Sequence, residues 1–336
     1  MRDMKEITLI KAAKEKALRG ELLDREVFIK LLEIDPLSKS CDILGEAADE
    51  VAKAVTKGQA YIWGAIGIDY HPCPMNCNYC SLGEKWGIVK EDYELPQGAI
   101  IDIVRKYVEQ KVRWIVLRTT QFYSTDKLKH LVERIRRDVA GEYELVINIG
   151  EFNSALADEF YDSGVDCAYH TLRLREGRDT AFNPDDRIGT MKSIKDSKLK
   201  LVSLVEPIGT EHSNEEIAEA LYNIVKYDAA VSGAMQRIPV KGTPLGELDP
   251  ISERRLAQII GAIRLALNYK VKDICVHMAS ETSVKFGANV VVVETGAVPR
   301  DDANVLSEDW NEFCPMDAER MFNAHGYKVI QRRESI

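Results

Sequence analysis

The sequence lacks the features that mark membrane and secreted proteins. No segment reaches the roughly 18 consecutive apolar residues of a membrane-spanning helix. The first twenty residues contain neither the apolar core nor the small-residue cleavage site of a secretory signal. We therefore expect a cytoplasmic protein with no membrane partner.

The sequence also has no cluster of basic residues. Lysine and arginine are scattered along the chain, and the formal net charge is −9. A protein that binds the phosphates of nucleic acid normally concentrates positive charge on one face. The composition therefore argues against a nucleic-acid partner and favours a small-molecule or carrier-bound substrate.

Cysteine is sparse but unevenly placed. The chain has seven cysteines among 336 residues, and three of them, Cys73, Cys77 and Cys80, fall within eight positions. An odd number with this crowding is typical of a metal site in a reducing compartment and does not suit a disulfide framework.

No tract rich in glycine and serine divides the chain into two folded units. Apolar residues at three- and four-residue spacing predict helices over residues 4–57, so we expect a helical N-terminal extension at 1–57. We expect the tail, 301–336, to form a C-terminal cap with one amphipathic helix that ends at Gly326.

Between these ends, short β-branched runs alternate with amphipathic helical segments. Parallel strands buried on both faces close most simply into a TIM-type (β/α)8 barrel, which we place at residues 58–300. The span 283–289 is too short for a long helix, which indicates an abbreviated final repeat. The predicted strands are 60–67, 113–118, 144–149, 165–170, 200–205, 232–238, 272–277 and 289–294.

The three crowded cysteines directly follow the first predicted strand. Three thiolates on a short loop can each bind one iron of a [4Fe–4S] cubane, which leaves the fourth iron open to a chelating molecule such as S-adenosylmethionine (SAM). One electron from the cluster can then cleave SAM to a 5′-deoxyadenosyl radical. The alternative is a tetrahedral zinc site with His71 as the fourth ligand.

The segment CPMNCNYC resembles the CxxxCxxC signature of the radical SAM superfamily, with Tyr79 in the usual aromatic place. Residues 60–300 resemble its biotin synthase-like branch, which includes hydrogenase-cofactor maturases and archaeal lipoyl synthase components. The matching segments are NIGEFN, GVDCAYHTLRL and RIPVKGTPLGELDP. The resemblance implies that Thr119, Thr120, Glu151 and Arg173 hold SAM, and we add Tyr79 and Arg237 to this cofactor-binding set.

The sequence departs from biotin synthase at its second, [2Fe–2S] cluster. The positions that correspond to the cysteine ligands of that cluster fall near Val116, Ile147 and Val202. A second cluster is therefore not supported by ligands of this type. We interpret Cys167 and Cys275 as core residues, whereas Cys41 and Cys314 lie in segments that can reach the barrel mouth.

We predict that the chain is a radical SAM enzyme that abstracts hydrogen from a small organic substrate in cofactor biosynthesis. Its electron donor would be a protein such as ferredoxin or flavodoxin. Candidate substrate residues at the barrel mouth are Tyr123, Glu206, Glu294 and Arg300. The alternatives are a lipoyl synthase component, a hydrogenase-cofactor maturase and a non-catalytic iron–sulfur carrier.

Overall fold

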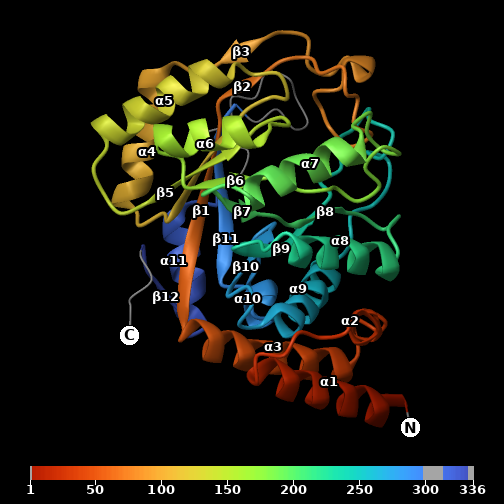
Figure 1. Cartoon of the computed structure of the whole chain (residues 1–336). Coiled ribbons are helices and arrows are strands. Elements are labelled where there is room, and N and C mark those ends of the chain that lie inside the picture. The colour runs from red at the N-terminus through yellow and green to blue at the C-terminus, as the bar shows by residue number, and fades with distance from the viewer. Residues whose placement is uncertain (1, 298–312, 332–336) are drawn as a thin grey trace.

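In the computed structural model the parallel strands close into a barrel (Figure 1). The structure describes residues 2–297 and 313–331. The pairings β11–β1 and β9–β10 close the barrel. Strands β7 and β8 are two consecutive segments that both pair with β9, so together they occupy one strand position in the barrel. The predicted (β/α)8 fold is confirmed. The barrel strands are β1 (Gln59–Gly67), β4 (Trp114–Arg118), β5 (Glu144–Asn148), β6 (Cys167–Tyr169), β7 (Lys200–Val202), β8 (Val205–Ile208), β9 (Val231–Gln236), β10 (Asp273–His277) and β11 (Val290–Gly296).

Alternation along the strands fills the barrel interior with large side chains. In β1, Tyr61 and Trp63 face the interior, whereas Ile62 packs in the layer between strands and helices. Trp63 is level with Trp114 of β4 and Val292 of β11, and the two indole rings lie 6.2 Å apart. The half of the barrel nearest the strand N-termini is therefore a packed core with no channel through it.

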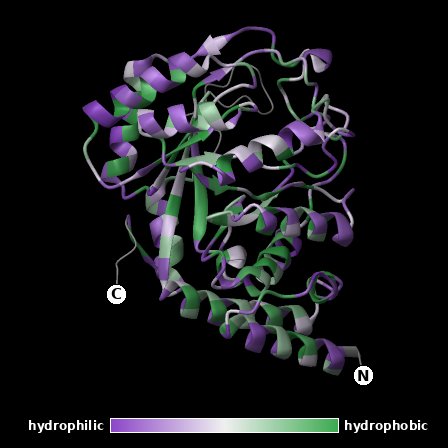
Figure 2. Ribbon diagram, viewed as in Figure 1, coloured by the Kyte–Doolittle hydropathy of each residue, from purple (hydrophilic) through white to green (hydrophobic). Residues whose placement is uncertain are grey.

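Helices alternate with the strands and cover the outside of the barrel. Figure 2 shows hydrophilic residues on their outward faces and hydrophobic residues along the strands. Ser124 and Asn153 cap two of these helices by accepting hydrogen bonds from the backbone N–H groups of Lys127 and Leu156. The predicted short repeat is a single turn of helix, α10. The helices are α4 (Gln97–Glu109), α5 (Thr125–Asp138), α6 (Ser154–Ser163), α7 (Pro184–Lys195), α8 (Asn214–Lys226), α9 (Glu253–Leu267) and α10 (Glu281–Lys285).

The first three helices cover the end of the barrel where β1 begins (Figure 1). They are α1 (Arg2–Leu18), α2 (Arg25–Leu32) and α3 (Lys39–Thr56). Helix α3 packs on α9 and α10 so closely that a Cβ at Gly45 would lie 2.7 Å from the Phe286 ring. Cys41 is fully buried in α3 at this end. The expectation that Cys41 can reach the barrel mouth is therefore wrong.

The described part of the tail packs beside β1 on the outside of the barrel. Helix α11 (Pro315–Ala324) buries Phe322 in the layer between strands and helices, and β12 (Lys328–Val329) pairs with the first residues of β1. Cys314 begins α11, and its Sγ lies 3.0 Å from Oδ2 of Asp317. The predicted substrate residue Arg300 lies outside the described residues.

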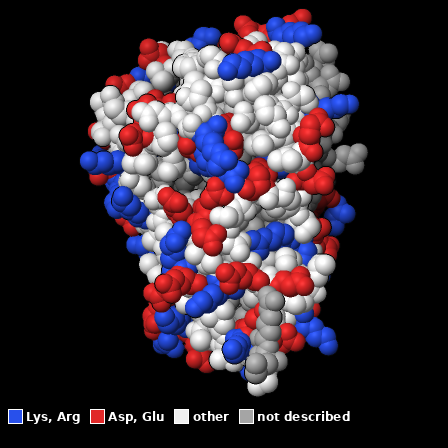
Figure 3. Space-filling model, turned by 90° about the vertical axis from the view of Figure 1, so that its right-hand side faces the viewer, with Lys and Arg blue, Asp and Glu red and all other residues white. Residues whose placement is uncertain are grey.

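The visible surface shows no concentration of one sign of charge. On the face in Figure 3, acidic and basic side chains are interspersed. Of the helices in the described ranges, none combines the length and the apolar character that crossing a membrane requires.

Two glycines allow a test of barrel closure. Gly233 of β9 has a φ of +147°, and a Cβ there would lie 1.8 Å from the carbonyl oxygen of Cys275 in the neighbouring strand. We expect Gly233→Ala to destabilise the protein by about 2 kcal/mol or more, since backbone cannot move aside as a flexible side chain can. Gly189 lies in α7 with no atom within 4 Å of its added Cβ. Gly189→Ala should stabilise the protein by about 0.5–1 kcal/mol.

Urea denaturation followed by circular dichroism measures both effects. Equal unfolding midpoints for the two variants would contradict the close approach of β9 to β10.

Candidate active site

The three crowded cysteines lie on a loop that closes on itself. The loop connects β2 (Asp69–Tyr70) to its antiparallel partner β3 (Tyr93–Glu94) and carries the short helix η1 (Glu84–Trp86). The Cys73 N–H donates to the Leu82 carbonyl at 2.6 Å, and the Glu84 N–H donates to the Cys73 carbonyl at 3.1 Å. A turn joins the other two cysteines, because the Cys80 N–H donates to the Cys77 carbonyl at 3.0 Å. All three thiols are free and half-buried.

Two other loops hold this cysteine loop in place. Asn78, between the second and third cysteines, donates its N–H to the Asp179 carbonyl at 2.8 Å. Its own carbonyl accepts the Leu245 N–H, also at 2.8 Å, and Ala181 N–H donates to the Met75 carbonyl at 3.1 Å. The β6–α7 and β9–α9 loops therefore fix the cysteine loop through backbone hydrogen bonds.

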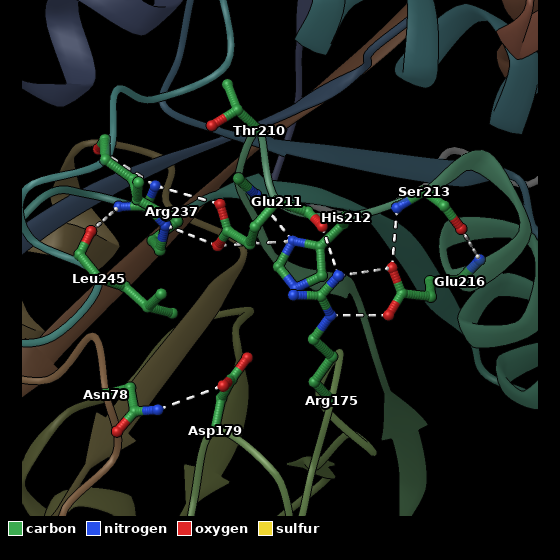
Figure 4. Close-up of polar contacts among 12 residues, drawn as sticks. Asn78, Arg175, Asp179, Thr210, Glu211, His212, Ser213, Glu216, Arg237 and Leu245 are labelled. Atoms are coloured by element: carbon green, nitrogen blue, oxygen red, sulfur yellow. Dashed lines mark hydrogen bonds and ion pairs between the residues drawn. The ribbon is translucent and has the colours of Figure 1, made fainter.

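Arg237 anchors the β9–α9 loop (Figure 4). Its side chain is 1% exposed, and its guanidinium donates two hydrogen bonds to the Glu211 carboxylate at 2.9 and 3.2 Å. A third hydrogen bond runs to the Leu245 carbonyl at 2.8 Å, and others run to the carbonyls of Leu248 and Asp249. Arg237 therefore acts on Asn78 through Leu245, with its donors turned toward protein acceptors.

The cysteine loop covers a cavity of about 300 Å³ at the C-terminal ends of the strands. Apolar side chains from the interior, with Trp63 and Leu204 among them, form its deep wall, and charged side chains surround them nearer the mouth. Of the predicted site residues, ten line this cavity: Cys73, Cys77, Tyr79, Cys80, Thr119, Thr120, Arg173, Glu206, Arg237 and Glu294.

The ligand-type side chains of the described residues form no single-ion site. Within residues 2–297 and 313–331, no three His, Cys, Asp or Glu side chains converge on one ion position. A cubane needs no such convergence, because each thiolate binds a different iron. His71, the proposed fourth zinc ligand, is engaged elsewhere, with Nε2 at 2.7 Å from the Thr120 hydroxyl and Nδ1 at 2.7 Å from the Pro72 carbonyl.

Burial controls the charge state of the site. It raises the pKa of the Cys77 thiol to about 12, so a thiolate at this position needs a compensating positive charge. Arg173 supplies part of this compensation. Its Nη1 is buried and has no hydrogen-bond partner among the described residues, and it lies 3.8 Å from the nearest oxygen of Glu176. A guanidinium edge therefore remains available to an anionic ligand.

Comparison with known proteins agrees with this geometry. No family model matches the chain. It is 23% identical to biotin synthase from Persephonella marina over 266 residues, 76% of this chain and 77% of that protein. It is 25% identical to biotin synthase from Staphylococcus aureus over 264 residues, 75% and 76% of the two chains. These matches and the CxxxCxxC loop at the barrel mouth point to the same relatives. The chain is similar to radical SAM enzymes of the biotin synthase-like type.

Solved structures show the same fold as this chain. Methylornithine synthase superposes with a TM-score of 0.79 over 96% of this chain and 98% of that one, at 17% identity. The [FeFe]-hydrogenase maturase HydG gives a TM-score of 0.80 over 98% and 79% of the two chains, at 12% identity.

Two predicted site residues lie away from the cavity wall. Glu151 accepts a short hydrogen bond from Gln121 Nε2, and its Oε1 lies 3.1 Å from Nε of Arg187. Both of these partners line the cavity, so Glu151 reaches it only through them. Tyr123 donates its hydroxyl proton to Glu94 at 2.8 Å, outside the cavity.

The residues assigned to the second cluster are only partly where the alignment put them. Val116 and Val202 face the barrel interior, but Ile147 packs in the outer layer with the helices. The inward-facing residues of β5 are its neighbours Val146 and Asn148, and Asn148 lines the cavity. The predicted position in β5 is therefore one residue out of register, and the inward-facing residues of β5 are likewise not cysteine.

Sequence reasoning missed several residues of the cavity wall. Arg187 lies in α7 and is 2% exposed, and burial together with Arg173 lowers its pKa to about 10. No sequence signal separates it from other helical arginines. His277 and Tyr169 end strands β10 and β6, so the rule that barrel sites lie at strand C-termini identifies both.

The anchoring role of Arg237 can be tested by amide hydrogen exchange. In Arg237→Met, we expect the amides of Leu245 and Asn78 to exchange about tenfold faster or more, because the loop loses the hydrogen bonds that hold it closed. Arg254→Met is the matched control, since Arg254 also donates to a backbone carbonyl, that of Pro36, on a different face. Unchanged exchange at Leu245 in Arg237→Met would refute the anchoring role.

Proposed function

We propose that Cys73, Cys77 and Cys80 hold a [4Fe–4S] cluster and that the protein uses it with SAM to abstract hydrogen from a small organic substrate in cofactor biosynthesis. The observation that carries this proposal is the shared cavity: three free thiols on one closed loop line it together with the unpartnered Nη1 of Arg173. When bound, the cluster supplies the electron that cleaves the sulfonium carbon–sulfur bond of SAM to give a 5′-deoxyadenosyl radical.

The chain's own residues would bind and orient SAM. Arg173 can donate two parallel hydrogen bonds to its carboxylate, the arrangement that arginine adopts with such anions. Thr119 and Thr120 line the neighbouring wall. The side chain of Thr120 is fixed by Asp69, which also accepts the Thr120 N–H at 2.8 Å. Glu151 would act indirectly, by holding Arg187 and Gln121 in place.

The rest of the cavity would shield the reaction. Apolar side chains deep in the barrel keep water away from a reactive radical, and the packed interior below them closes the far end. The electron would come from a donor such as ferredoxin or flavodoxin. Free thiols at all seven cysteines suit a reducing cytoplasm.

Substituting the three cluster cysteines tests the ligand assignment. We expect the wild-type protein, reconstituted with iron and sulfide, to hold about four irons per chain, and the triple variant Cys73→Ser, Cys77→Ser, Cys80→Ser to hold almost none. With SAM and dithionite, the triple variant should also make no 5′-deoxyadenosine. Iron analysis and chromatography of the nucleoside measure the two results.

Cys314→Ser is the control, and it should keep about four irons because serine also caps a helix well. About eight irons in the wild type and about four in Cys314→Ser would instead reveal a second cluster that depends on Cys314. Four irons in the triple variant would disprove the ligand set.

Substituting Arg173 tests the binding of SAM. Arg173→Gln should weaken SAM binding by about tenfold to a hundredfold, the loss expected for a hydrogen-bonded ion pair. Arg178→Gln, in the same loop but exposed, should leave the affinity unchanged. Calorimetric titration of the reconstituted, oxidised proteins gives both dissociation constants. Equal affinities in the two variants would exclude Arg173 from the SAM site.

A further inference from the structure

The cavity has an acidic side that SAM binding, as proposed, does not use. Around the wall, Glu206 is on β8, His277 on β10 and Glu294 on β11, and the pairing β8–β9–β10–β11 places His277 between the two carboxylates. Arg173 and the cysteines lie toward the covering loop. Two guanidinium groups adjoin these carboxylates: Arg118 lies 3.4 Å from Glu294, and Arg173 lies 3.9 Å from Glu206.

The imidazole of His277 has an unused acceptor in this region. Its Nε2 lies 3.1 Å from Oε2 of Glu294, and an ionised carboxylate only accepts hydrogen bonds, so Nε2 carries the proton. In the neutral ring, Nδ1 is then an acceptor. The residue is 3% exposed, and Nδ1 has no hydrogen-bond partner among the described residues. A buried acceptor left unpaired carries a desolvation penalty, which a hydrogen bond from a ligand N–H would offset.

Glu206 offers a second acceptor close by. It is 6% exposed, and one carboxylate oxygen accepts a short hydrogen bond from the Tyr169 hydroxyl. The other oxygen lies 3.9 Å from Nε of Arg173, which is beyond hydrogen-bond distance. Burial raises the pKa of Glu206, although the charge of Arg173 and the hydrogen bond from Tyr169 oppose this effect. Its negative charge is thus only partly compensated by the protein.

We infer that Glu206 and His277 form a subsite for the amino group of the substrate. An ammonium group has three N–H donors and no acceptor, which matches one carboxylate oxygen and one imidazole nitrogen. The carbon chain of such an amine would lie on the apolar wall formed by Val116, Leu204 and Val292. The substrate class is therefore a small primary amine with a short apolar body. That the bound amine is the substrate rests on the proposed function, whereas the amine subsite itself does not.

Three probes of equal carbon number test this subsite: pentylamine, pentan-1-ol and pentanoate. Each is titrated by calorimetry into the anaerobically purified full-length protein at pH 7, without SAM or reductant. We expect saturable one-to-one binding of pentylamine and at least tenfold weaker binding of the other two probes. Equal binding of all three, tighter binding of pentanoate, or no saturable binding of pentylamine would overturn the inference.

Variants locate the binding. Glu206→Gln keeps the shape of the side chain and removes its charge, so it should weaken pentylamine binding about tenfold or more. Glu219→Gln, an exposed residue of α8, is the matched control and should bind as the wild type does. His277→Ala is the second variant and should weaken binding about fivefold, provided that its thermal unfolding shows a folded protein. Unchanged affinity in folded Glu206→Gln would remove the subsite from this cavity.

The result is separable from the proposed function because no step needs the cluster. A protein that binds pentylamine through Glu206 but holds no iron would contradict the proposed function and leave the amine subsite standing. A protein that holds four irons and cleaves SAM but ignores pentylamine would do the reverse.

Discussion

Closure of a parallel sheet is the constraint on which the rest of the structure depends. Once β9 pairs with β10 and β11 with β1, the C-terminal ends of all the barrel strands meet at one rim. Side chains at the ends of β4, β8, β10 and β11 then face the same space although they are far apart in sequence. The interior below this rim is filled by aromatic and branched side chains, so the rim alone offers room for a ligand.

Loops from the same rim determine where the cysteines lie. The β6–α7 loop donates and accepts the backbone hydrogen bonds that hold Asn78 and Met75, and the same loop carries Arg173 into the cavity. The β9–α9 loop reaches Asn78 through Leu245 and is itself tied down by Arg237. The position of the thiols and the position of the guanidinium are therefore set by one set of hydrogen bonds, and neither can shift far without the other.

The sequence allowed the barrel to be predicted because its signals are local. Each β-branched run became a strand, and only the run 200–205 divided, into β7 and β8 around Ser203 and Leu204. Which strand residues point into the barrel was harder to predict, because a shift of one residue moves a side chain to the other face of the strand. Ile147 is an example. The spacing of Cys73, Cys77 and Cys80 located the cysteine loop for the same local reason.

The features that could not be predicted from the sequence depend on contacts between distant segments. Arg237 directly follows β9 and is predicted from the sequence to bind the cofactor, but the fold of residues 240–249 turns its donors toward protein carbonyls. Arg187 reaches the cavity from a helix, where no rule based on strand ends applies. The position of α1–α3 at the opposite end of the barrel depends on the apolar surface of α9, of which 12 residues are buried. These positions follow from tertiary packing, which a single sequence does not display.

Because one end of the barrel is closed, molecules can enter and leave the cavity only at its mouth. A guest that sits against Trp63 and Leu204 has the packed interior beneath it and the cysteine loop above it. Whatever occupies the deepest position has to arrive before the molecule that lies over it and can depart only after that molecule has left. The geometry of a blind pocket thereby sets a first-in, last-out sequence for any two molecules that share it.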